Sequence, residues 1–229
     1  MPSFSKRLLV VVGGYGSGKS EVSVNLARYL ADSQSEPVAI ADLDIVNPYF
    51  RSREAAEQLA ALGVRSIVPP GEQAHADLPI IIPEIHSAIK RHEGYLILDV
   101  GGDDVGSRVL SSLADAFTPD DYEMLLVLNA NRPFTATVEG AQKMIADIEG
   151  ASRLTFTGLA GNTHLMEYTT ADTVLDGLAL TRRVSEATGL PIVFVSALRP
   201  ILEDMTSRIR DLAVLPLDRS LVKPWEKRA

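Results

Sequence analysis

The segment from residue 13 to residue 20 has the residue types and spacing best suited to chemistry. It reads Gly-Gly-Tyr-Gly-Ser-Gly-Lys-Ser, fits the pattern G-x-x-x-x-G-K-[ST], and lies between an apolar run and a segment with helical spacing. Glycines let the backbone curl so that successive N–H groups face a phosphate, and the following helix adds its positive N-terminal end. The pattern predicts a phosphate-binding loop. The alternative is a glycine turn with a capping serine and an incidental lysine.

Two residues of this loop have specific expected roles. Lys19 is expected to reach the β- and γ-phosphates of a nucleotide as a catalytic group, and the Ser20 hydroxyl is expected to ligate Mg²⁺. The predicted nucleotide-binding residues in the loop and in the turn that follows are Gly13, Gly14, Tyr15, Gly16, Ser17, Gly18, Lys19, Ser20 and Glu21.

Two carboxylates follow the second apolar run of the chain. Asp42 and Asp44 stand at positions i and i+2, so they point to the same side of an extended chain. Without a cation they would repel each other, and the pKa of one would rise. Binding of Mg²⁺ with its waters, or activation of a water, would explain why the two carboxylates stand so close together. The alternative is a solvated acidic end of a strand.

A third acidic position ends the apolar run 95–98. Asp99 begins the pattern D-x-x-G, which ends at Gly102. A carboxylate at the end of this strand suits the magnesium shell, and the Gly102 N–H is placed to face a γ-phosphate. The alternative is a simple Asp-Gly turn. We expect Asp103 and Asp104 to cap the next helix rather than to take part in catalysis.

Strands and helices must alternate to bring these residues together. Hydrophobic periodicity predicts strands over 8–12, 38–41, 64–68, 95–99, 124–128, 154–159 and 192–195, and helices over 19–31, 54–62, 83–91, 105–115, 134–148, 170–188 and 200–211. This alternation predicts a parallel sheet covered by helices on both faces. The proline-rich stretch 69–83 is expected to be a loop, and 215–229 a surface tail of a single domain that spans 1–229.

Composition excludes several classes of protein. The chain has 229 residues, no cysteine, and 22 Lys and Arg against 30 Asp and Glu, which gives a net charge of −8. Disulfides, thiol nucleophiles and thiolate metal sites are therefore excluded. The acidic balance disfavours nucleic-acid binding, and Pro224 interrupts the only segment that resembles a membrane-binding C-terminal helix. With too few apolar residues for a signal segment near Met1, we expect a cytoplasmic protein.

The motifs taken together resemble the MinD/ParA/CobQ/CobB group of P-loop ATPases, whose members are often labelled cobyrinic acid a,c-diamide synthase. The resemblance rests on the phosphate loop, the Asp-Leu-Asp at 42–44 and the Asp-Val-Gly-Gly at 99–102. Several members of the group also have segments very similar in sequence to 46–54, 129–135 and 161–165. The resemblance implies a three-layer α/β P-loop NTPase fold with a mostly parallel sheet of seven or eight strands. It also implies Mg-ATP binding, slow hydrolysis, and nucleotide-dependent dimerisation or partner switching.

The same resemblance implies further residue roles. Asp44 is implied to position the attacking water, and Ser20, Asp42 and Asp99 to form the metal shell. Asn162 is implied to lie beside the adenine, with Leu198 of the loop 196–200 against its other edge. The segment 47–53 is predicted to be a switch that senses the γ-phosphate, with ordinary packing as the alternative.

One position departs from the signature of the group. The group places a second lysine directly after the first glycine of the loop, and this chain has Gly14 there. Three consequences stay open: slower hydrolysis, substitution by another cation such as Arg51, Arg53 or Arg132, or absence of the sandwich dimer.

The leading functional hypothesis is a magnesium-dependent ATPase that acts as a nucleotide switch on an unknown protein partner and can form a homodimer. ATP is favoured over GTP, because neither 129–132 nor 162–165 contains the N/T-K-x-D pattern typical of guanine sites. The alternatives are a synthetase or kinase that activates a small carboxylate, and a nucleotide-binding module without turnover. The cobyrinate enzyme itself is disfavoured, because it carries an additional glutamine-hydrolysing domain with a cysteine nucleophile.

Overall fold

A computed structural model describes residues 1–33, 35–44, 55–67, 82–91 and 93–221. The described strands form one eight-stranded sheet in the order β3-β2-β4-β1-β5-β6-β7-β8, and all neighbouring strands run parallel. The strands are β1 (Leu8–Gly13), β2 (Val38–Asp42), β3 (Arg65–Ile67), β4 (Tyr95–Gly101), β5 (Tyr122–Leu128), β6 (Gly158–Gly161), β7 (Ile192–Leu198) and β8 (Val214–Leu217).

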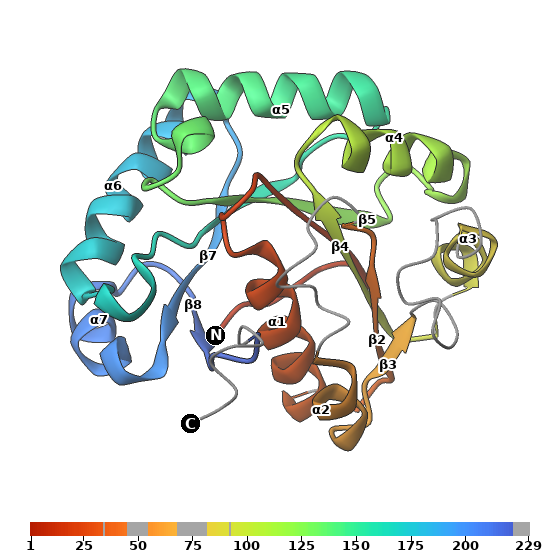
Figure 1. Cartoon of the computed structure of the whole chain (residues 1–229), viewed down its shortest axis with the longest axis horizontal. Helices are drawn as coiled ribbons and strands as arrows, with labels where there is room; N and C mark the ends of the chain where they lie inside the picture. The colour runs from red at the N-terminus through yellow and green to blue at the C-terminus, as the bar shows by residue number, and fades with distance from the viewer. Residues whose placement is uncertain (34, 45–54, 68–81, 92, 222–229) are drawn as a thin grey trace.

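Helices cover both faces of this sheet (Figure 1). They are α1 (Lys19–Ser33), α2 (Ala56–Ala61), α3 (Ile82–Arg91), α4 (Asp104–Leu113), α5 (Val138–Ser152), α6 (Ala171–Thr188) and α7 (Leu202–Arg208). In the view of Figure 1, α4 and α5 lie above the sheet and α1 and α2 lie below it. The expected three-layer α/β fold with helices on both faces is confirmed. None of the described helices is both long and apolar enough to cross a membrane.

Alternation along β1 shows how the two apolar layers form. Leu8, Val10 and Val12 belong to a cluster with residues of α3, α4 and α5, whereas Leu9 and Val11 pack with residues of α1 and α2 on the other face. All five side chains are buried. A strand that is apolar on both faces is typical of the centre of a parallel sheet, and β1 lies there, between β4 and β5.

Local signals explain where several helices begin. The Asp103 carboxylate accepts hydrogen bonds from the N–H groups of Val105 and Gly106 and caps α4, as expected. The helix predicted over 134–148 begins only at Val138, because a 3₁₀ turn at Pro133–Thr135 comes first and the Thr137 hydroxyl then caps α5.

The expected surface tail over 215–229 is wrong for its first residues. β8 pairs in parallel with β7, and Leu217 and Leu221 are buried. Pro216 is tolerated because β8 is an edge strand, where a missing N–H costs no ladder hydrogen bond. The strand predicted over 154–159 also lies later, at Gly158–Gly161. Residues 222–229, the switch predicted over 47–53 and most of the loop predicted over 69–83 lie outside the described residues.

Candidate functional site

The loop between β1 and α1 is wound tightly around its glycines. The Ser17 N–H donates to the carbonyl of Gly14 at 3.0 Å, and the Val22 N–H donates to that of Gly18 at 3.0 Å. Gly16 and Gly18 have φ angles of 75° and 82°, in the left-handed region that favours glycine. The predicted phosphate loop therefore has a compact turn that leads directly into a helix N-terminus.

Two side chains from loops that follow other strands lie against these glycines. The Arg132 Nε donates to the Gly16 carbonyl at 2.8 Å, and the Asn162 Nδ2 donates to the Ser17 carbonyl at 2.8 Å. A Cβ atom at Gly16 would lie 2.6 Å from the Arg132 Nε, and one at Gly18 would lie 2.3 Å from the Asn162 Nδ2. The two glycines thus give the loop its turn and make room for the side chains that hold it.

Lys19 lies in the first turn of α1 and forms a buried ion pair with Asp44. Burial lowers the pKa of Lys19, but the nearby carboxylates of Asp99 and Asp44 outweigh burial and leave this pKa raised. Lys19 is therefore a charged ammonium group held by a carboxylate.

The predicted acidic residues meet at the ends of β2 and β4. Asp42 and Asp99 are direct neighbours in the ladder between these strands. The Asp44 N–H donates to the Asp42 Oδ1 at 3.0 Å. Burial raises the pKa of Asp99 to about 6, against the opposing effect of Lys19. The structure thus brings the three carboxylates together beside Lys19.

These residues fit a magnesium ion that shares its coordination with a phosphate. The Ser20 Oγ and the Asp99 Oδ2 are buried and make no hydrogen bond with another described residue. No group of three or more His, Cys, Asp or Glu in the described part of the chain has the arrangement of a protein-only metal site. Mg²⁺ needs no such group, because it usually keeps several waters and binds one or two protein oxygens plus substrate phosphates.

Gly102 and Asn162 have contacts that the sequence did not predict. The Gly102 N–H, expected to face a γ-phosphate, donates to the Gly13 carbonyl at 3.0 Å. The Asn162 side chain bridges the loop to β7, because its Oδ1 accepts from the Ser196 Oγ at 2.8 Å while its Nδ2 holds Ser17. Asn162 is thus a support of the phosphate loop in this structure.

His164 lies near Arg132, on the side of the loop where a cavity opens. Its Nδ1 accepts from the Met166 N–H at 3.5 Å, and its Nε2 is buried without a hydrogen bond to another described residue. Burial, with the charge of Arg132 as a second cause, lowers the pKa of His164 to about 4. The imidazole is therefore neutral at pH 7.

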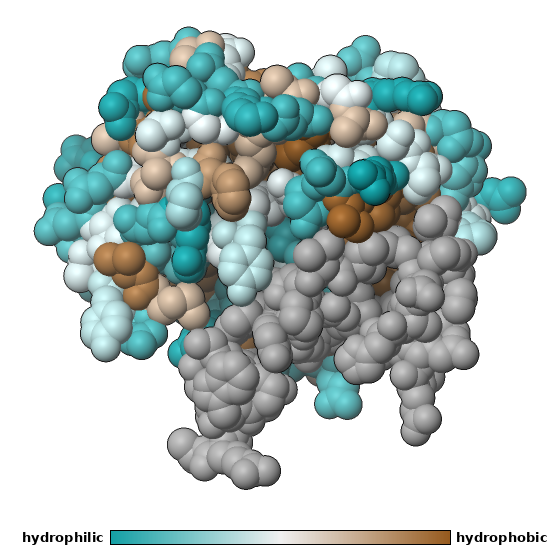
Figure 2. Space-filling model, turned by 45° about the horizontal axis from the view of Figure 1, so that its top comes forward, coloured by the Kyte–Doolittle hydropathy of each residue, from teal (hydrophilic) through white to brown (hydrophobic). Residues whose placement is uncertain are grey.

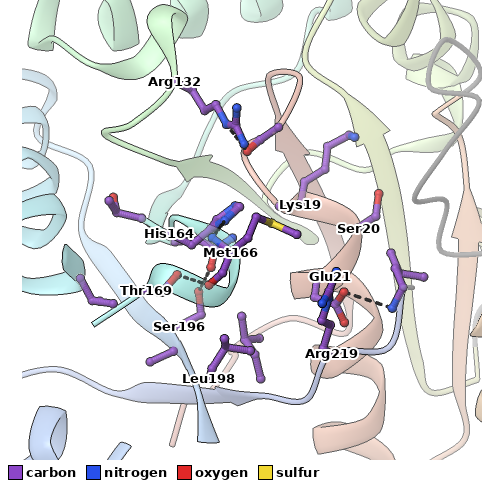
Figure 3. Close-up of a pocket in the computed structure, with 18 of the residues that line it drawn as sticks. Lys19, Ser20, Glu21, Arg132, His164, Met166, Thr169, Ser196, Leu198 and Arg219 are labelled. Atoms are coloured by element: carbon purple, nitrogen blue, oxygen red, sulfur yellow. Dashed lines mark hydrogen bonds between the residues drawn. The ribbon is translucent and has the colours of Figure 1, made fainter. Parts of the chain in front are cut away.

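A cavity of about 420 Å³ opens in front of the loop. Lys19 and Ser20 lie at one side of it, Arg132 lies at the top of the view in Figure 3, and Leu198 and Arg219 lie at the bottom. The predicted residues that line the cavity are Tyr15, Gly16, Gly18, Lys19, Ser20, Glu21, Asn162 and Leu198. The cavity therefore has a charged region at the loop and, at the ends of β7 and β8, an apolar region of leucine side chains beside Arg219.

Sequence reasoning missed the wall formed by Leu217, Arg219 and Leu221. The sequence analysis predicts a surface tail over these residues, although the apolar run at 213–217 is a signal for a final strand. Asp42, Asp44 and Asp99 do not line the cavity itself but lie behind Lys19.

Comparison with solved structures identifies the fold. FtsY from Thermotoga maritima matches with a TM-score of 0.57 and 23% identity over 86% of this chain and 63% of that chain. FtsY from Mycoplasma mycoides matches with a TM-score of 0.54 and 18% identity, over 86% and 61%. A nucleotide-binding protein from Archaeoglobus fulgidus in complex with ADP matches with a TM-score of 0.52 and 17% identity, over 82% and 80%. The fold is that of the P-loop NTPases.

At sequence identities of 17–23%, these matches show a shared P-loop NTPase fold and no more. The chain spans less than two thirds of the length of the two FtsY proteins. No protein-family model and no curated protein matches the sequence. The eight-stranded P-loop NTPase sheet confirms the expected fold class, whereas membership of the MinD/ParA group stays a prediction.

Proposed function

We propose that this protein binds a nucleoside triphosphate with Mg²⁺, prefers ATP, and hydrolyses it slowly. The observation that carries the proposal is a pair of buried oxygens beside Lys19 that make no hydrogen bond with another described residue: Ser20 Oγ, on the wall of the 420 Å³ cavity, and Asp99 Oδ2, behind Lys19. Buried polar atoms without partners are costly, so their presence beside a phosphate loop favours a ligand that completes them.

Each residue of the site has a distinct part in this function. The loop N–H groups and Lys19 bind the phosphates, and Ser20, Asp99 and Asp42 hold Mg²⁺, which neutralises phosphate charge when bound. A bound phosphate competes with Asp44 for Lys19, because both are anions and the buried Lys19 ammonium group is already paired with the Asp44 carboxylate. Once Asp44 releases Lys19, its carboxylate is able to orient an attacking water.

The base preference is the second part of the proposal. The Archaeoglobus protein named above was solved in complex with ADP, and an FtsY from Elizabethkingia anophelis was solved in complex with GDP. Because this sequence lacks a guanine-type N/T-K-x-D segment, we favour adenine, with Leu198 and the neighbouring apolar wall against the base.

Exposed apolar residues around the site favour a role as a switch on a protein partner. On the face shown in Figure 2, hydrophilic residues predominate. Six large hydrophobic residues of the described chain are exposed, and four of them, Tyr15, Phe134, Leu165 and Tyr168, follow β1, β5 and β6 at the edge that carries the phosphate loop. A partner or a second copy of the chain that covers this edge would contact the loop directly.

Equilibrium binding and phosphate release test the proposal. We expect Mg-ATP to bind, Mg-GTP to bind more weakly, and phosphate to be released slowly in a single-turnover assay. Binding without phosphate release would favour the module without turnover. Phosphate release that requires an added small carboxylate would favour the synthetase or kinase alternative. Absence of binding by either nucleotide would contradict the proposal as a whole.

A further inference from the structure

The segment that follows β8 forms one wall of the cavity. Leu217 and Leu221 are 6% and 2% exposed, and with Arg219 they face the same space as Lys19 and Ser20. A nucleotide has a charged phosphate end and a flat aromatic base, whose faces pack well against apolar side chains. Since the phosphate loop occupies one region of the cavity, the apolar region at Leu198, Leu217 and Leu221 is the place that suits the base.

Helix α1 holds this wall through one face. The Glu21 carboxylate accepts hydrogen bonds from the N–H groups of Ser220 at 2.6 Å and Leu221 at 3.2 Å. Four residues later, the Asn25 side chain accepts from the Asp218 N–H at 2.8 Å and donates to the Asp218 carbonyl at 2.9 Å. Figure 3 shows Glu21 and Arg219 together at the lower side of the cavity.

The unfavourable burial of the Glu21 carboxylate indicates that its contacts with the wall have a functional role. The Glu21 carboxylate is partly buried, and both of its oxygens are used by backbone N–H groups of the wall, Oε1 by Ser220 and Oε2 by Leu221. Burying a carboxylate is unfavourable unless hydrogen bonds compensate it. Glu21 directly follows Lys19 and Ser20 in the chain, so the helical turn that positions the phosphate-binding groups also fixes the opposite wall.

We infer that Glu21 and Asn25 are positioning residues for the nucleobase. They hold the segment 217–221 in place as the apolar wall against which the base packs. The inference rests on the proposed function, because it needs a nucleotide in the cavity. The expected ligand is a purine nucleotide. Glu21, predicted from the sequence as a nucleotide-binding residue, acts on the nucleotide through the backbone of Ser220 and Leu221.

Binding of Mg-ATP and of Mg-bound inorganic tripolyphosphate tests the inference, because tripolyphosphate has the phosphates but no base. In Glu21→Gln one carboxylate oxygen becomes an NH₂ group that faces a backbone N–H, and loss of a charged hydrogen bond is worth about tenfold in affinity. We expect Glu21→Gln to weaken ATP binding about tenfold and to leave tripolyphosphate binding within about twofold.

Glu123→Gln is the matched control. The Glu123 carboxylate also accepts two backbone N–H groups of a distant segment, from Ser5 at 2.6 Å and Lys6 at 3.1 Å, but it does not line the cavity. This variant is expected to bind both ligands as the unaltered protein does. Leu221→Ala removes part of the wall directly and is expected to reproduce the selective loss of ATP binding if Glu21→Gln fails to fold.

Two results would overturn the inference and leave the proposed function standing. One is an equal weakening of ATP and tripolyphosphate binding by Glu21→Gln or Leu221→Ala. The other is equal affinity of the unaltered protein for the two ligands, because the wall would then contribute nothing. If the unaltered protein binds neither ligand, the proposed function fails first, and the inference fails with it.

Discussion

At the scale of single residues, the central feature of the site is the buried ion pair between Lys19 and Asp44. Both side chains are buried, and Lys19 also lies in the field of Asp99 and Asp42. A buried charge is tolerated when an opposite charge compensates it. The pair therefore keeps Lys19 ionised and oriented, and under the proposed function a nucleotide phosphate has to displace Asp44 to reach it.

Lys19→Ala is expected to abolish nucleotide binding or turnover. It should also lower the free energy of unfolding by about 3–5 kcal/mol, the usual effect of removing one partner of a buried ion pair. Binding assays and urea unfolding measure the two effects. The double variant Lys19→Ala/Asp44→Asn removes the orphaned charge, so it should recover most of the stability and none of the binding. Nucleotide turnover by well-folded Lys19→Ala would contradict the phosphate-loop assignment.

Asp44→Asn is expected to separate binding from turnover. The amide cannot accept a proton from water, so hydrolysis should fall by roughly a hundredfold or more. The affinity for Mg-ATP should stay within about tenfold, because the substitution also removes the anion that competes for Lys19. Single-turnover phosphate release and equilibrium binding give the two quantities. A parallel loss of both would instead assign Asp44 to the metal shell.

The half-buried His164 should make the fold sensitive to acid. Its pKa is lowered to about 4 in the folded chain, against about 6.5 in an unfolded chain. The unfolded state therefore binds a proton first as the pH falls, and stability is lost between about pH 6.5 and pH 4. In His164→Gln the loss of unfolding free energy over this window should be smaller by about 2–3 kcal/mol. An unchanged pH profile of urea unfolding would show that His164 does not contribute.

At the scale of elements, the phosphate loop depends on strands that lie far from it in the sequence. Arg132, beyond β5, holds Gly16, and Asn162, beyond β6, holds Ser17. Parallel strands bring these loops to one edge of the sheet, where ligands of open α/β sheets bind. The conformation of the loop therefore depends on the neighbouring strands as well as on its own glycines.

Asn162→Ala distinguishes two roles for this side chain. If Asn162 supports the loop, the variant should bind Mg-ATP and Mg-tripolyphosphate more weakly by a similar factor, about tenfold for a buried hydrogen-bonding side chain. If Asn162 instead recognises adenine, only ATP binding should fall. Ser196→Ala, which removes one hydrogen bond to the Asn162 Oδ1, should show the same pattern more weakly.

The sequence predicted local features well and distant pairings poorly. The strand–loop–helix at the phosphate loop, the Asp-Leu-Asp at the end of β2 and the Asp103 cap each depend on neighbouring residues, and the structure confirms their places. The bond from the Ser220 N–H to Glu21 joins residues 199 positions apart. No periodicity within either segment encodes that contact, because it depends on β8 completing the edge of the sheet.

At the scale of the whole molecule, nucleotide binding should stabilise the fold. A ligand at a hundredfold excess over its dissociation constant adds roughly 2.7 kcal/mol. For a domain of this size that free energy corresponds to a rise in Tm of about 5–10 °C. Mg-ATP should reach this shift at a lower concentration than Mg-GTP. Equal responses in melting curves with each nucleotide would overturn the preference for adenine without affecting the phosphate loop.

The strand order has a consequence for how the chain can assemble. β4 lies between β1 and β2, and β1 lies between β4 and β5. If the backbone were cut between β3 and β4, the first piece would carry β1 without either of its neighbours, and the second piece would have a gap one strand wide between β4 and β5. Each piece would have to insert a strand into the other. The two pieces therefore cannot dock as finished halves, and the centre of the sheet can form only when both fold together.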